Sequence, residues 1–101
     1  MTAYRLRISA HAQADLEHLF LFLVEHDFDA ALRARAAIER AYAQLQEFPF
    51  AYRKAGAGED PFLRELLVPF GNAGYVILFE IGRDAMVTVA AVRHQREDDY
   101  R

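Results

Sequence analysis

Residues 62–92 read FLRELLVPFGNAGYVILFEIGRDAMVTVAAV and contain three β-rich runs separated by two short turn sequences. Branched and aromatic residues that alternate or run together are typical of strands, and the glycine, asparagine and aspartate between the runs favour tight turns. The middle run is apolar on both faces, so we expect it at the centre of the sheet. The expected strands, which form an antiparallel meander, are residues 62–68, 75–81 and 86–92.

The chain before this meander shows one strand-like and two helix-like patterns. Residues 4–8 alternate apolar side chains with arginine, which predicts a short first strand. Ser9 stands where a helix N-cap is expected, and the apolar spacing after it indicates a first helix that ends near residues 25–27. Asp27 or Asp29 can cap a second amphipathic helix, so we expect the two helices to form an antiparallel hairpin.

Residues 49–61 hold two of the three prolines and two glycines, so we expect them to form the longest irregular connection. The chain is also rich in aromatic residues, which can fill the core or line a groove for a partner. Phe50 and Tyr52, within this connection, are expected to be exposed and are candidate partner-binding residues. Three other rings are expected to lie in the core: Phe20, Phe48 and Phe79.

The length of 101 residues, of which 53% are hydrophobic, suits one domain spanning residues 1–101. The element order β-α-α-β-β-β predicts an α+β fold in which a two-helix hairpin packs on a small antiparallel sheet. No cysteine is present, the N-terminus lacks the apolar core of a signal peptide, and no apolar run is long enough to span a bilayer. We therefore expect a soluble cytoplasmic protein without a membrane partner.

Charged residues crowd the end of the chain, where the last expected strand runs directly into residues 93–101, RHQREDDYR. This edge offers cations, a histidine and a tyrosine to a phosphate or to a protein partner. The acidic run at residues 97–99 is typical of a flexible tail, so we expect no metal site, and no cofactor motif is present. The candidate partner-binding residues at this edge are Arg93, His94, Arg96 and Tyr100.

Three stretches stand out together with the order of elements. They are residues 4–8 followed by ADL at 14–16, REL at 64–66, and VRHQREDDY at 92–100. Over the whole chain they resemble the RelE/ParE superfamily of toxins, in its ParE-like, plasmid-stabilisation branch. The resemblance implies the toxin of a type II toxin–antitoxin system, held inactive in a hetero-oligomer with a cognate, ParD-like antitoxin.

The superfamily includes two mechanisms, and its fold does not choose between them. A ParE-like toxin inhibits DNA gyrase by protein–protein contact and is not an enzyme. A RelE-like toxin is a metal-independent endoribonuclease that cleaves messenger RNA on the ribosome. A third interpretation is an inactive relative that only binds its partner. For a nuclease, the candidate catalytic residues are Arg64, His94, Arg96 and Tyr100.

Charge favours the gyrase-binding mechanism. The net charge is −3, with 15 acidic and 12 basic residues, whereas affinity for RNA phosphates comes from positive charge. The carboxylates at residues 97–99 would also repel RNA phosphate next to His94. Arg64 lies in an expected strand, where we expect it either to point towards a partner or to pair with Glu80 across the sheet.

Overall fold

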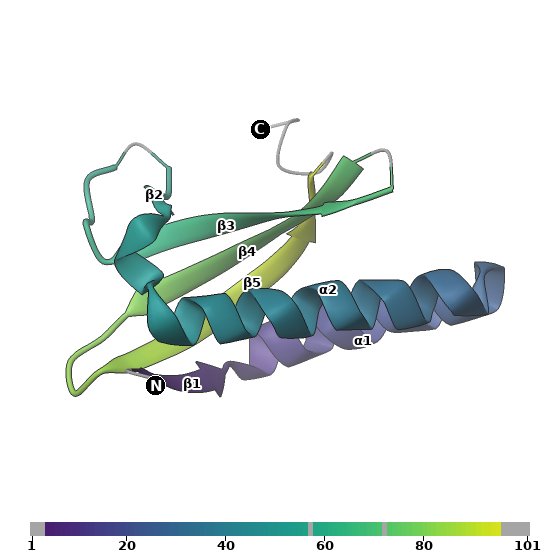
Figure 1. The fold of residues 1–101 in the computed structure, drawn as a ribbon, viewed down its shortest axis with the longest axis horizontal. Coiled ribbons are helices and arrows are strands. Elements are labelled where there is room, and N and C mark those ends of the chain that lie inside the picture. Colours follow the sequence, from purple (N-terminus) through teal and green to yellow (C-terminus); the bar gives the residue numbers. More distant parts are fainter. Residues whose placement is uncertain (1–3, 57, 72, 96–101) are drawn as a thin grey trace.

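The computed structural model describes residues 4–56, 58–71 and 73–95 of the chain. Its elements follow the expected order, so the α+β fold class is confirmed. The two helices are α1 (Ala10–His26) and α2 (Phe28–Glu47), and they lie side by side across one face of the sheet (Figure 1). No helix in this described part is long and apolar enough to cross a membrane. The strands are β1 (Arg5–Ile8), β2 (Arg53–Lys54), β3 (Leu63–Phe70), β4 (Ala73–Ile81) and β5 (Met86–His94).

The five strands form one sheet in the order β1-β5-β4-β3-β2, which places β4 at its centre as expected. β3, β4 and β5 form the expected antiparallel meander. β1 pairs with β5 in parallel, with Arg5 opposite Met86 and Ile8 opposite Val89. The sheet is therefore antiparallel except at this edge. Here the last strand, β5, lies parallel to the first strand, β1, and the rest of the chain forms the long connection between them.

The connection between α2 and β3 is more regular than expected. It contains a short 3-10 helix, η1 (Pro49–Ala51), and the two-residue strand β2, which pairs with the start of β3. Arg53 Nε lies 2.6 Å from Glu65 Oε1, so an ion pair accompanies the backbone pairing. The prolines and glycines mark the turns of this connection correctly, but they gave no sign of the short strand between them.

One aspartate serves both helices at the tip of the hairpin. Asp27 Oδ1 accepts a hydrogen bond from the Ala30 N–H at 3.1 Å and so caps the start of α2. The Asp27 N–H donates to the Leu23 carbonyl at 2.6 Å, which closes the end of α1. Ser9 caps α1, because its Oγ accepts from the Ala12 N–H at 3.1 Å. The predicted cap at Ser9 is confirmed, and of the two aspartates proposed for α2 the structure selects Asp27.

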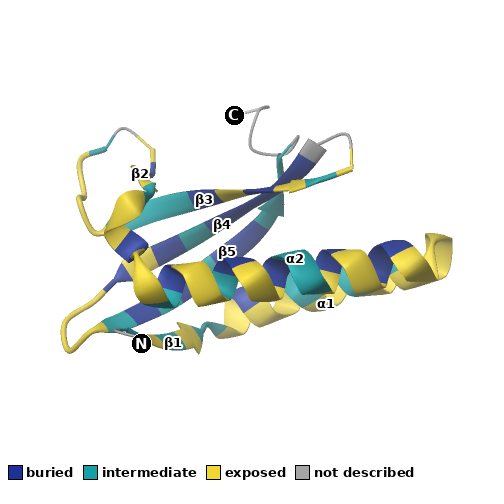
Figure 2. Ribbon diagram, in the orientation of Figure 1, coloured by how far each residue is buried: buried dark blue, intermediate teal, exposed yellow. Residues whose placement is uncertain are grey.

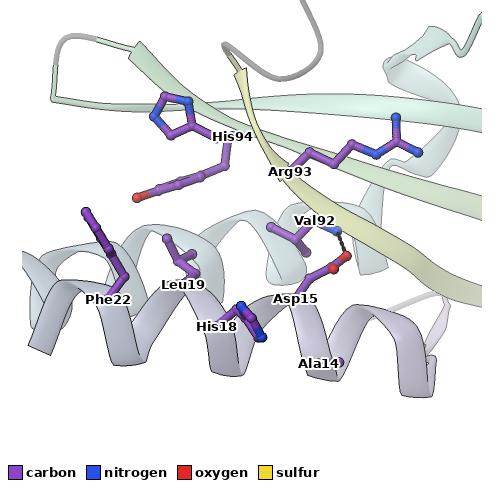
Figure 3. Close-up of a pocket in the computed structure, with 9 residues that line it drawn as sticks. Ala14, Asp15, His18, Leu19, Phe22, Val92, Arg93 and His94 are labelled. Atoms are coloured by element: carbon purple, nitrogen blue, oxygen red, sulfur yellow. Dashed lines mark hydrogen bonds between the residues drawn. The ribbon is translucent and has the colours of Figure 1, made fainter.

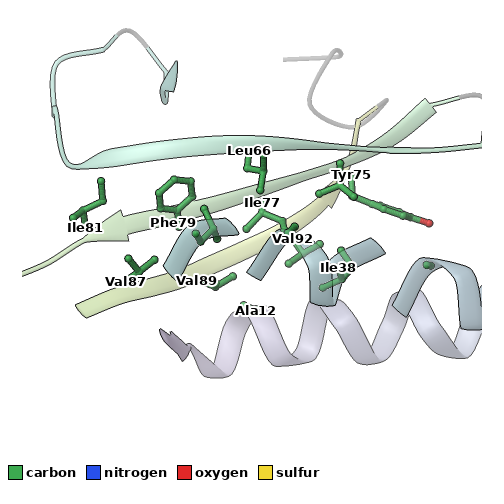
Figure 4. Close-up of a cluster of buried hydrophobic side chains, with 14 residues drawn as sticks. Ala12, Ile38, Leu66, Tyr75, Ile77, Phe79, Ile81, Val87, Val89 and Val92 are labelled. Carbon is green, nitrogen blue, oxygen red and sulfur yellow. The ribbon is translucent and has the colours of Figure 1, made fainter. Parts of the chain in front are cut away.

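The core lies between the two helices and the inner face of the sheet, where buried segments are dark blue in Figure 2 and the buried side chains are drawn in Figure 4. Full burial of a valine, leucine, isoleucine or phenylalanine side chain contributes about 1.5–3 kcal/mol to folding. The buried stripe of α2 consists of Ala34, Ile38, Ala41 and Leu45. The strand side chains that are fully shielded are Ile77, Phe79, Val87 and Val89.

The three rings expected in the core have different environments. Phe79 is fully buried, and Phe20 is partly buried at the edge of the core. The prediction for Phe48 is wrong, because its side chain is 65% exposed. α2 ends one residue earlier, and Phe48 adopts φ −137° and ψ 57°, which turns its ring away from the helical stripe.

Candidate partner-binding site

A β-bulge sets the direction of the side chains at the end of β5. The register shifts between Leu78 and Phe79 of β4, which leaves Ala90 as an extra residue in β5. Beyond the bulge, His94 stands opposite Tyr75, a member of the core, so its side chain lies on the helix face of the sheet. Without the extra residue, the alternation along the strand would turn His94 to the other face.

The side chains of Ser9, the N-cap of α1, and of Asp15 in α1 form hydrogen bonds with the edge of β5 beyond the point where β1 ends. Ser9 Oγ donates a hydrogen bond to the Ala90 carbonyl at 3.1 Å. Further along, Asp15 Oδ2 accepts from the Val92 N–H at 2.9 Å. His11 Nε2 lies 3.5 Å from the same oxygen and forms an ion pair with it when the imidazole is protonated. These contacts fix the first two turns of α1 against the strand that carries the predicted site.

A cavity of about 560 Å³ lies between α1 and the end of β5 (Figure 3). One wall is a face of α1. The other consists of the last residues of β5 together with Tyr75, near the start of β4. The apolar part of the wall includes Leu19 and Phe22. The titratable residues that line it are Asp15, His18, Tyr75, Arg93 and His94.

Tyr75 is the most enclosed of these residues, with 4% of its surface exposed. Its ring stacks on Phe70 with 5.6 Å between centroids, and the His94 ring meets it edge-on at 5.8 Å. Burial raises the pKa of Tyr75 above its usual value of 10.0, because the ionised phenolate loses its hydration. Tyr75 is therefore a neutral phenol at physiological pH and is able to donate a hydrogen bond.

The residues predicted at the end of the chain are only partly within the described residues. Arg93 and His94 are half-buried and line the cavity beside α1. Arg96 and Tyr100 lie outside the residues that the structure describes, so their roles stay predictions. Within the described part of the chain, no group of three histidines or carboxylates is close enough to hold a metal ion.

Arg64 is bound to backbone carbonyls. Its Nε donates to the Pro61 carbonyl at 2.7 Å, and its Nη1 donates to the carbonyls of Tyr52 at 2.8 Å and Phe50 at 3.2 Å. In the sheet, Glu80 stands opposite Leu63. The contacts of Arg64 with backbone carbonyls therefore match neither expectation, a pairing with Glu80 or a side chain that points towards a partner. The guanidinium joins both ends of the connection between α2 and β3 and so holds that connection in place.

The connection that Arg64 holds presents an exposed aromatic surface, which we call the aromatic edge and which consists of Phe50 and Phe62. These side chains are 48% and 49% exposed, and their rings meet edge-on with 6.2 Å between centroids. The Arg64 guanidinium carbon lies 5.3 Å from the centroid of the Phe50 ring, a cation–π geometry. The prediction that Tyr52 is exposed is wrong: the residue is half-buried, because its ring packs edge-on against Phe79 and its hydroxyl donates to Gln44 Oε1 at 3.3 Å.

The structure does not bring Arg64 and His94 together. Arg64 stands opposite Phe79 in the sheet, whereas His94 stands opposite Tyr75. Four residues of β4 separate these two levels, which corresponds to roughly 13 Å along the strand. The two side chains also come from strands on either side of β4. The aromatic edge and the cavity beside α1 are thus two surfaces at opposite ends of the sheet.

Sequence reasoning missed three titratable residues of the cavity: Asp15, His18 and Tyr75. A partial signal exists in α1, because residues 15, 18, 19 and 22 share one helical face. That face contains a carboxylate and an imidazole where a core stripe would be wholly apolar. Tyr75 gave no such signal, because an aromatic residue at the start of a central strand is ordinary core composition.

The chain is similar to proteins of known type. The family described as "ParE toxin of type II toxin-antitoxin system, parDE" matches residues 6–99. A protein named "Toxin RelE1" from Caulobacter vibrioides is 35% identical over 78 residues, which are 77% of this chain and 80% of that protein. A solved structure described as "Chromosomal ParDE TA system from P. aeruginosa" has a TM-score of 0.67 and 17% identity, and the match covers 91% of this chain and 96% of that one. At that identity the likeness to the solved structure concerns the fold.

Proposed function

The chain belongs to the ParE toxin family of type II toxin–antitoxin systems, and we propose that it inhibits DNA gyrase by protein–protein contact. A cognate, ParD-like antitoxin neutralises it in a toxin–antitoxin hetero-oligomer. Both encounters take place in the cytoplasm, where gyrase acts.

The observation that carries the proposal is the separation of Arg64 from His94. Metal-independent cleavage of RNA requires a cation at the phosphate and a proton-transfer group within hydrogen-bond reach of the same reacting atoms. Arg64 is committed to three backbone carbonyls, at the opposite end of the sheet from His94. This arrangement favours a protein that acts through its surfaces over one that acts through this pair of residues.

The charge of the chain supports the same proposal. A net charge of −3 opposes close approach to RNA, whose phosphates attract proteins through lysine and arginine. Binding to a protein has no such requirement, because interfaces depend chiefly on a few buried aromatic and arginine anchors. The aromatic edge, with Phe50 and Phe62 exposed beside Arg64, offers anchors of this kind.

One observation favours a second candidate, a ribosome-dependent endoribonuclease. The cavity beside α1 brings a neutral phenol at Tyr75 together with the imidazoles of His18 and His94. Such groups can transfer protons during cleavage of RNA. The relative named Toxin RelE1 is also similar over most of this chain.

Expression of the chain in bacterial cells tests the proposal. Inhibition of gyrase predicts growth arrest with loss of negative supercoiling in a reporter plasmid, while messenger RNA stays intact. Co-expression of the protein encoded by the neighbouring gene should restore growth. Arrest with cleaved messenger RNA and unchanged plasmid topology would support the nuclease instead, and absence of arrest would indicate an inactive relative that only binds its partner.

A further inference from the structure

A groove runs along the outer side of α2, between this helix and β3. It consists of two connected cavities of about 150 and 580 Å³, and both are lined by Ala37, Arg40 and Pro69. We call it the α2–β3 groove. It shares no lining residue with the cavity beside α1 and is thus a separate surface.

The α2–β3 groove is basic in a chain that is acidic overall. Its helical wall carries small residues at Ala37 and Ala41, with the exposed side chains of Arg33 and Arg40 at the rim. No described residue that lines it is acidic. The net charge of the whole chain is −3, so this groove has the sign opposite to the rest of the molecule.

The two arginines at this rim differ from their neighbour Arg35. Arg35 Nε lies 3.0 Å from Glu39 Oε1, and both side chains are on the solvent-facing side of α2. Among the described residues, neither Arg33 nor Arg40 has an ion pair or a side-chain hydrogen bond. Two guanidinium groups therefore stand at the groove with their donors available to carboxylates of a partner.

We propose that the α2–β3 groove binds an acidic segment of the antitoxin, with carboxylates paired to Arg33 and Arg40. The inference rests on the proposed function, which supplies the antitoxin as a partner. Charge complementarity identifies the occupant, since an acidic segment satisfies both arginines while its apolar side chains cover the alanine wall.

The edge of β3 beside the groove favours one backbone conformation for the bound segment. β2 pairs with β3 only at Arg64 and Glu65, and further along this edge Pro69 has no N–H to donate. A continuous ladder of backbone hydrogen bonds is therefore disfavoured, and recognition depends on side chains. A chain in the extended polyproline conformation, which needs no backbone partner, suits such a groove.

The spacing of the two arginines predicts the spacing of the partner's carboxylates. Arg33 and Arg40 are seven positions apart in α2, which is about 10.5 Å along the helix axis. In a polyproline helix, residues three apart share one face and lie about 9.3 Å from one another. The segment should therefore carry an acidic residue at every third position.

Two labelled peptides of identical composition test this inference. The first, Glu-Pro-Leu-Glu-Pro-Leu-Glu, has the predicted spacing, and the second contains the same residues with its glutamates consecutive. Fluorescence anisotropy measures the binding of each peptide to the full chain. Because exposed ion pairs contribute little individually, removal of both arginines in Arg33→Gln/Arg40→Gln should weaken binding of the first peptide by about tenfold at low salt.

A matched control removes two positive charges elsewhere. Arg35→Gln/Arg83→Gln changes the net charge equally but leaves the groove intact, so it should bind the first peptide like the wild type. Unchanged melting temperatures and circular dichroism spectra establish that both variants fold.

Several outcomes would overturn the inference: no binding of the first peptide, equal binding of the two peptides, or equal losses in the two double variants. None of these results bears on gyrase inhibition, which is measured with the wild-type chain and without peptide. A negative result for peptide binding in the α2–β3 groove can therefore be told apart from a negative result for the proposed function.

Discussion

The carboxylate of Asp15 in α1 accepts a hydrogen bond from the backbone N–H of Val92 in β5, with 2.9 Å between the two atoms. β1 pairs with β5 only as far as Val89. Beyond that residue, a side chain instead of a strand supplies the hydrogen-bond acceptor for the edge of β5. A carboxylate acceptor makes this bond stronger than one between neutral groups. The bond thereby ties the helical hairpin to the end of the strand that carries His94.

Replacement of Asp15 by alanine should destabilise the protein by about 1–3 kcal/mol, because the partly buried Val92 N–H loses its acceptor. Chemical unfolding measures this change, and faster hydrogen exchange of the Val92 amide would locate it. Glu17→Ala, on an exposed position of the same helix, is the matched control and should change stability little. Equal effects of the two substitutions would show that the hydrogen bond from Val92 to Asp15 does not contribute measurably to stability.

Arg64→Lys should also lower stability by about 1–3 kcal/mol, although it keeps the positive charge. A lysine has one nitrogen, and it cannot reproduce the bonds from Nε and Nη1 to the carbonyls of Phe50, Tyr52 and Pro61. The NMR signals of the aromatic edge should shift, since Arg64 holds the segment that carries Phe50.

Arg53→Lys is the control for this substitution, because a lysine at that position can still pair with Glu65. It should cost less than Arg64→Lys in a thermal or chemical unfolding experiment. A stable Arg64→Lys protein with an unchanged aromatic edge would contradict the structural role of Arg64.

Tyr42→Phe should leave stability unchanged or raise it by as much as about 1–2 kcal/mol. Among the described residues, the Tyr42 hydroxyl is buried without a hydrogen-bond partner, so its removal relieves a desolvation cost. Tyr52→Phe is the control, because it removes a hydroxyl that donates to Gln44 and should be mildly destabilising. Marked loss of stability in Tyr42→Phe would mean that the hydroxyl has a partner after all.

Tyr42 also predicts a loss of stability in alkali. Burial raises the pKa of Tyr42 from 10.0 to about 12, so between these values the unfolded chain loses the proton while the folded chain keeps it. The free energy of unfolding should be unaffected by this group below pH 10 and should fall as the pH rises towards 12, by at most about 2 kcal/mol after allowance for solvent screening. Urea unfolding across this range should show a smaller decline in Tyr42→Phe, and equal declines would contradict the assignment.

His94→Ala separates the two candidate mechanisms. A residue that transfers a proton contributes about a hundredfold or more to a rate, whereas truncation of one contact at a protein interface commonly costs less than about tenfold in affinity. For a gyrase-binding toxin we expect the variant to retain most of its inhibition, measured as the concentration that halves supercoiling. A hundredfold loss of activity would indicate a catalytic role for His94.

The sequence contained enough information to predict the main elements of the fold. The period of two over residues 62–92 and the cap at Ser9 are local signals, and the structure confirms both. β2 was missed, because two residues are too few for any periodicity. The exposure of Phe48 was also missed, because it depends on the residue at which α2 ends.

The site was less predictable because its contacts join distant parts of the chain. Asp15 and Val92 are 77 positions apart, and no local pattern indicates that one accepts a hydrogen bond from the other. The carbonyls around Arg64 belong to the backbone, which carries no signature in the sequence. Residue types suggested that Arg64 and His94 act together, whereas the register of the sheet places them at opposite ends.

The most direct measurement is the supercoiling of relaxed plasmid by purified gyrase, titrated with the purified chain. We predict that supercoiling decreases as the chain is added and that the antitoxin restores it, while messenger RNA in a parallel translation reaction stays intact. Full supercoiling at a saturating concentration of the chain, together with cleaved messenger RNA in the translation reaction, would contradict inhibition of gyrase.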